Sequence, residues 1–265
     1  MADSKSDSRV WEFVPPIARL RRAPWHAQVD VSRPQLGLHQ LRLDEFAIDG
    51  QLAGVVPSGV TAWPAKVVDT YVRGHDLVAT YEPTADWPYA PQLYWRAERL
   101  DTGQGVVTSV SLLVSVQTNL LDTHPRIEVA SSLPADEVLR VAIADGEAAH
   151  VEALLGGERT IHPRADVCCV LRRLPGGRLS YAEFMPASDF RRLTVDLQPR
   201  PSARPNHTPS GGDCHTRWEL FAEFLEKGVI RRVRLQLAVL DRAGDIELAA
   251  ECCRTMKRRP LPLTT

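Results

Sequence analysis

Residues 110–116 read VSLLVSV, with an apolar side chain at every second position. Strict alternation of this kind predicts a β-strand that faces a core on one side. The same alternation returns near the end of the chain, where residues 233–239 read VRLQLAV. Each run follows a glycine, Gly105 or Gly228, that would end the preceding turn. Both runs therefore predict strands of a mainly antiparallel, all-β fold.

Other segments of the two halves also resemble one another, in the same order. Residues 55–64 align without a gap with residues 154–163, and residues 83–87 align with residues 186–190. Residues 127–130 (IEVA) match residues 246–249 (IELA), which would close each copy with a strand. Alternation alone does not produce such matches. We therefore predict a tandem duplication of a β-rich unit of about 100 residues, with a pseudo-twofold arrangement.

The duplication divides the chain into parts. Residues 1–40 would form an N-terminal arm, 41–133 the first β repeat, 134–256 the second, and 257–265 a C-terminal tail. The second repeat carries an inserted loop at 199–215. Residues 135–155 conflict with the repeat, because their composition favours a helix. The repeat predicts strands there, and we follow it, so the fold has at most short helices.

Composition excludes several classes of protein. The chain has 265 residues, of which 44% are hydrophobic and 25% charged, as in ordinary globular proteins. Its formal net charge of −1 gives no reason to expect nucleic acid as a partner. No segment has the apolar length of a signal peptide or a membrane helix. We expect a soluble cytoplasmic protein, without membrane contact, and leave open whether it forms homo-oligomers.

One candidate ligand site combines carboxylates with aromatic rings. Asp86, Trp87 and Tyr89 lie together in the first half, and Asp189 takes the place of Asp86 in the second. An aromatic ring can stack on a sugar while a carboxylate accepts hydrogen bonds from its hydroxyls. The alternative is that these residues only maintain the fold. The aspartate would then fix a turn, and the aromatic ring would close the core.

The inserted loop supplies a candidate metal site. His207, Asp213 and His215 are its candidate metal ligands, and Cys214 lies between the last two. Imidazole and thiolate groups suit zinc or a similar ion. Their spacing matches no established zinc motif, so a polar loop without a metal is the alternative.

Function remains open at the level of sequence. The chain contains none of the common nucleotide-binding, serine-hydrolase or metalloprotease motifs, and nothing in it specifies a cofactor. The leading hypothesis is a non-enzymatic binding or scaffold protein, whose ligand is a glycan, another small molecule or a protein. The alternative is a hydrolase with a His/Asp site, metal-dependent or not, in the inserted loop.

Overall fold

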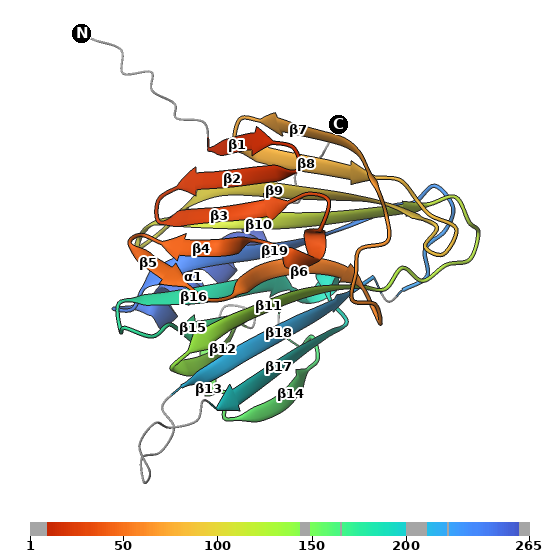
Figure 1. Ribbon diagram of the computed structural model, residues 1–265. Coiled ribbons are helices and arrows are strands. Elements are labelled where there is room, and N and C mark those ends of the chain that lie inside the picture. The colour runs from red at the N-terminus through yellow and green to blue at the C-terminus, as the bar shows by residue number, and fades with distance from the viewer. Residues whose placement is uncertain (1–9, 144–148, 165, 200–210, 222, 260–265) are drawn as a thin grey trace.

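The computed structural model describes residues 10–143, 149–164, 166–199, 211–221 and 223–259. In these residues the chain forms three antiparallel sheets and one α-helix (Figure 1). The prediction of an all-β, mainly antiparallel fold is confirmed.

The largest sheet has nine strands and contains both alternating runs from the sequence. In spatial order its strands are β13 (His150–Ala153), β12 (Glu137–Ile143), β15 (Val167–Arg173), β16 (Leu179–Pro186), β19 (Ile230–Asp241), β10 (Gly105–Thr118), β9 (Tyr89–Thr102), β8 (Asp76–Tyr81) and β7 (Val67–Arg73). Strands β10 and β19 pair with each other at the centre, where Leu112 lies opposite Leu235. The alternate apolar side chains of both runs are buried on one face, as predicted.

Two five-stranded sheets cover this face, and Figure 1 shows one above the other in front of the nine-stranded sheet. The N-terminal sheet consists of β1 (Trp11–Val14), β2 (Ile17–Arg22), β3 (Trp25–Asp30), β4 (His39–Leu43) and β5 (Phe46–Ile48). The second, here called the β18 sheet, has the spatial order β14 (Gly157–Ile161), β17 (Arg192–Pro199), β18 (Gly212–Leu220), β11 (Ile127–Ala135) and β6 (Gln51–Pro57). Two short 3₁₀ helices, η1 (Pro34–Leu36) and η2 (Ala187–Asp189), lie in connections.

One hydrophobic core joins the three sheets. The N-terminal sheet contributes Trp11 and Trp25, the nine-stranded sheet Trp95, and the β18 sheet Trp218, all at most 1% exposed. The Trp11 indole N–H donates to the His75 carbonyl at 2.9 Å, which fixes the N-terminal sheet to the large one. Because the N-terminal sheet shares this core, residues predicted as an arm contain the packed strands β1, β2 and β3.

A helix, α1 (Asp245–Arg258), covers the opposite face of the large sheet over β15, β12 and β16. The prediction of a strand at residues 246–249 is therefore wrong. Acidic residues occupy the first turn of α1 and basic residues the last, which suits the helix dipole, and its buried face carries Ala249, Cys252 and Met256. No helix in the described part of the chain is long and apolar enough to span a membrane.

The tandem duplication is not confirmed. Strand β11 follows β10 in the chain, whereas β18 precedes β19, so the two halves run through the two sheets in different orders. The segment that would close the second copy is helix α1 rather than a strand. Residues 137–143 and 150–153, where composition favours a helix, do form strands β12 and β13. The predicted bounds of the parts stay a prediction.

Candidate functional site

A row of polar residues crosses the outer face of the β18 sheet. Strand pairing places Glu158 opposite Asp196, Asp196 opposite His215, His215 opposite Ser132, and Ser132 opposite Gln51. Side chains at directly opposite positions of antiparallel strands share a face and have Cβ atoms about 5 Å apart. Five strands, from Gln51 on β6 to His215 on β18, therefore bring these groups into one continuous line.

Alternation along β18 and β17 explains why these side chains face outward. On β18, Cys214, Thr216 and Trp218 point into the core, and His215 lies between the first two on the other face. On β17, Leu193 and Val195 are buried, which leaves Asp196 accessible. The alternation of side chains along these strands therefore places the apolar residues in the core and the site residues on the outer face.

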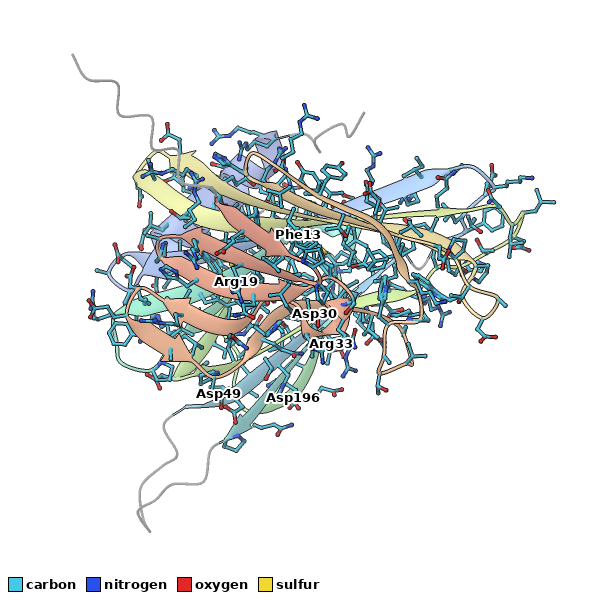
Figure 2. The ribbon with its side chains drawn as sticks, turned by 45° about the horizontal axis from the view of Figure 1, so that its top comes forward. Phe13, Arg19, Asp30, Arg33, Asp49 and Asp196 are labelled. Atoms are coloured by element: carbon cyan, nitrogen blue, oxygen red, sulfur yellow. The ribbon has the colours of Figure 1, made fainter. Side chains whose placement is uncertain are left out.

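The row forms the floor of a hollow of about 280 Å³. Its lining adds Thr194, Arg217 and the small residue Ala130 to the floor. On the next strand, Gly54 lies opposite Ala130, and η1 rests on the outer face of β6 at this glycine. Figure 2 shows Asp196 at the lower edge of the front face, below Asp30 of β3. The hollow therefore opens on the face that the two smaller sheets present.

The charges around the hollow are mixed. The Gln198 amide donates to Asp196 Oδ2 at 2.9 Å and so orients this carboxylate. Arg217 Nε lies 3.3 Å from Glu128 Oε2 on the neighbouring strand β11. The site thus offers an imidazole, two carboxylates and a guanidinium, together with hydroxyl and amide groups. These groups can exchange protons and form hydrogen bonds with a polyhydroxylated ligand.

The aromatic residues predicted to bind a ligand lie in a cluster of their own. The Trp87 ring centroid is 5.3 Å from those of Trp63 and Tyr89, in edge-to-face contacts, and both predicted rings are buried. Asp86 is exposed, in the connection between β8 and β9. Asp189 follows β16, and strands β19 and β10 separate it from β9. The structure does not bring the predicted carboxylates together, and a ligand at either one stays a prediction.

Asp189 lines a second hollow of about 610 Å³ beside the end of α1. Burial raises the pKa of Asp189, although its carboxylate accepts a hydrogen bond from the Arg234 backbone N–H at 3.1 Å. Two cations there form ion pairs, Lys257 with Asp166 at 2.7 Å and Arg259 with Glu98 at 3.0 Å. The described lining of this larger hollow includes no imidazole. We therefore place the candidate site in the smaller one.

The predicted metal site is described only in part. His207 lies outside the described residues, as does most of the inserted loop. Asp213 and His215 both face outward from β18. Among the described residues, no three histidine, cysteine, aspartate or glutamate side chains converge as metal ligands. A metal at His207, Asp213 and His215 stays a prediction, while His215 belongs to the polar row.

Comparison with known proteins finds similar folds among solved structures but no similar sequence. No family model and no curated protein matches the sequence. Among solved structures, a putative aldose 1-epimerase from Escherichia coli K12 matches with a TM-score of 0.53 and 10% identity, over 85% of this chain and 99% of that one. One from Klebsiella pneumoniae matches with a TM-score of 0.53 and 9% identity, over 91% and 83%. The protein HI1317 matches with a TM-score of 0.52 and 7% identity, over 86% and 97%.

The chain has the fold of these putative aldose 1-epimerase structures. This finding corrects our leading hypothesis of a non-enzymatic binding or scaffold protein, because two of the structures with this fold are named as putative enzymes. The sequence did not predict this similarity of fold, since the identities are only 7–10%. The alternative hypothesis, a hydrolase site in the inserted loop that uses His207, Asp213 and His215, stays a prediction, because His207 lies outside the described residues.

Proposed function

We propose that the protein is a carbohydrate-acting enzyme that interconverts the α and β anomers of a free aldose in the hollow of the β18 sheet. Two observations support this. The fold is that of structures named for aldose 1-epimerases. The observation that carries the proposal is the row in which Asp196 and His215 lie on directly opposite positions of β17 and β18.

The chemistry needs an acid and a base that lie close together. To open the sugar ring, a base removes the proton from the hydroxyl on C1, the bond from C1 to the ring oxygen breaks, and an acid protonates that oxygen. Rotation about the adjacent C–C bond presents the other face of the aldehyde, and the reverse proton transfers close the ring. Both oxygens are bonded to the same carbon, so neighbouring strands give the acid and base the required proximity.

The row assigns roles to its members. His215 would protonate the ring oxygen, and Asp196 would take the proton from the C1 hydroxyl, with the Gln198 amide orienting the carboxylate. Ser132, Gln51 and Arg217 line the same hollow and would bind the other hydroxyls. No redox step occurs: when the ring closes, His215 takes its proton back from the former ring oxygen, and Asp196 returns its proton to the oxygen on C1.

Polarimetry of freshly dissolved α-D-glucose or α-D-galactose, in dilute buffer to limit background catalysis, tests the proposal. The protein should accelerate mutarotation, and His215→Ala and Asp196→Asn should each reduce kcat by about 10²- to 10⁴-fold. Arg192→Gln provides the matched control. Arg192 also lies on β17 but pairs with Glu219, outside the hollow, so its replacement should leave the rate nearly unchanged. Absence of acceleration across a panel of aldohexoses and aldopentoses would contradict the proposed function.

A further inference from the structure

Behind the polar row, two opposite charges lie entirely within the core. Arg172 on β15 and Glu183 on β16 are both 0% exposed, and Arg172 Nη1 lies 3.3 Å from Glu183 Oε1. Removing two charges from water is costly, and a buried pair is often no more stabilising than apolar side chains of the same size. Their presence therefore calls for an explanation other than the stability of the core.

The guanidinium of Arg172 contacts the two inward side chains that flank His215. Arg172 Nε lies 3.2 Å from Cys214 Sγ, and Arg172 Nη2 donates to Thr216 Oγ1 at 2.5 Å. Because Cys214 and Thr216 alternate with His215 along β18, these contacts hold the backbone on both sides of the histidine. The arginine thus lies directly behind the centre of the polar row.

Glu183 binds the same strand and extends the network to its neighbours. Its Oε2 accepts hydrogen bonds from Thr216 at 2.8 Å and from the Trp218 indole at 2.9 Å. Ser131 on β11 also hydrogen-bonds Glu183. The Ser131 hydroxyl in turn accepts from the backbone N–H of Ala53, where β6 bulges, at 2.9 Å. Three strands of the hollow's floor are therefore tied to one buried ion pair.

The pair stays charged. Burial by itself would raise the pKa of Glu183, but the Arg172 charge and the hydrogen bonds from Ser131, Trp218 and Thr216 outweigh burial and lower it. Tyr181 adds a hydrogen bond to Glu183 Oε1 at 3.0 Å, and its ring packs against the guanidinium. Charged groups with fixed partners impose direction on their neighbours, which apolar packing does not.

We propose that Arg172 and Glu183 are positioning residues, which fix β18 and β11 from behind so that His215 and Ser132 face the hollow in one geometry. The role in catalysis rests on the proposed function, whereas the effect on the His215 side chain does not. The pair itself touches no ligand, because the β18 sheet separates it from the hollow.

The decisive variant replaces both charges, Arg172→Met with Glu183→Leu, which leaves no unpaired charge in the core. It also removes the acceptor of the Trp218, Thr216 and Tyr181 hydrogen bonds, so its Tm should be somewhat lower than that of the wild type. We expect kcat for mutarotation to fall by about 10- to 100-fold, since a misplacement of about 1 Å at a reacting group is sufficient for such a loss. In NMR spectra of histidine-labelled protein, the His215 ring signals, identified by their loss in His215→Gln, should broaden or split. Thr216→Val removes one link only and should produce a smaller effect of the same kind.

Leu171→Ala is the matched control, because Leu171 is buried on the opposite face of β15, toward α1. It should lower Tm while leaving kcat and the His215 signals unchanged. If the wild-type protein accelerates no aldose, the proposed function fails, and the NMR signals still test the positioning role. His215 signals in the double variant that match the wild type would overturn the inference. If the double variant does not fold, unchanged signals in Thr216→Val would overturn it.

Discussion

Gly54 is a single residue on which the shape of the candidate site depends. A Cβ atom at this position would lie 2.2 Å from the carbonyl oxygen of Gln35 in η1. The close approach lets η1 rest on β6 beside the hollow. Any larger side chain would force the two segments apart.

Gly54→Ala should therefore lower the free energy of unfolding by about 1–3 kcal/mol, because the new methyl group overpacks a backbone contact. Urea denaturation followed by circular dichroism measures this loss. Gly103→Ala is the control, since no atom lies within 4 Å of a Cβ at that position. Equal stability losses in the two variants would show that η1 does not constrain β6.

For individual residues, the sequence predicted one member of the polar row, His215, and did not predict the residues that lie beside it. The sequence predicted His215 as a metal ligand, because it lies near other residues of metal-binding type. The structure places it in the polar row instead. Asp196 and Glu158 come from β17 and β14, and only strand register brings them beside His215. A weak signal was present, because polar Thr194 and Asp196 alternate with apolar Leu193 and Val195. Register between distant strands is not readable from one sequence.

Among the elements, α1 depends on a buried carboxylate at its first turn. Asp245 is 1% exposed and accepts hydrogen bonds from Arg173 at 2.9 and 3.0 Å and from Ser180 at 2.7 Å. Burial would raise the pKa of Asp245, but the hydrogen bonds from Arg173 and Ser180 and the positive charges nearby lower it. This carboxylate joins the start of the helix to β15 and β16.

Asp245→Asn should cost about 1.5–3 kcal/mol of stability at neutral pH, the range for hydrogen bonds to a charged group. Because the folded-state pKa is depressed, this contribution is present above the ordinary value of 3.8 and is lost as pH falls through the lower folded pKa. Thermal unfolding from pH 7 to pH 2.5 should show the two proteins converging in acid. Glu247→Gln, exposed in the same turn, should change stability by only a few tenths of a kcal/mol.

The helix also shows where sequence patterns mislead at this scale. Residues 246–249 resemble a strand of the first half, yet Ala249, Cys252 and Met256 recur at helical spacing and the segment ends in basic residues, as helices do. The reverse holds for residues 137–143, where tertiary pairing with β15 overrides helix propensity. A match of four residues does not distinguish a strand from the first turn of a helix, whereas the residues of the following turns do.

For the whole molecule, the shared core predicts how the protein unfolds. Trp11, Trp25, Trp95 and Trp218 belong to one buried cluster that joins all three sheets. Tryptophan fluorescence and far-UV circular dichroism should therefore report one transition with the same midpoint. Two separated transitions would contradict a common core and would support independent units near the predicted bounds of 41–133 and 134–256.

The alternation that places His215 on one face and Cys214 on the other has an evolutionary consequence. Under the proposed function, selection on ligand preference would act mainly on outward positions of the β18 sheet, while selection on folding would act on the inward positions between them. The two sets can diverge at different rates, and under the proposed function a lineage could exchange one sugar for another without passing through unfolded intermediates. A library that randomises only Glu158, Thr194 and Ser132 would sample new specificities on an unchanged scaffold.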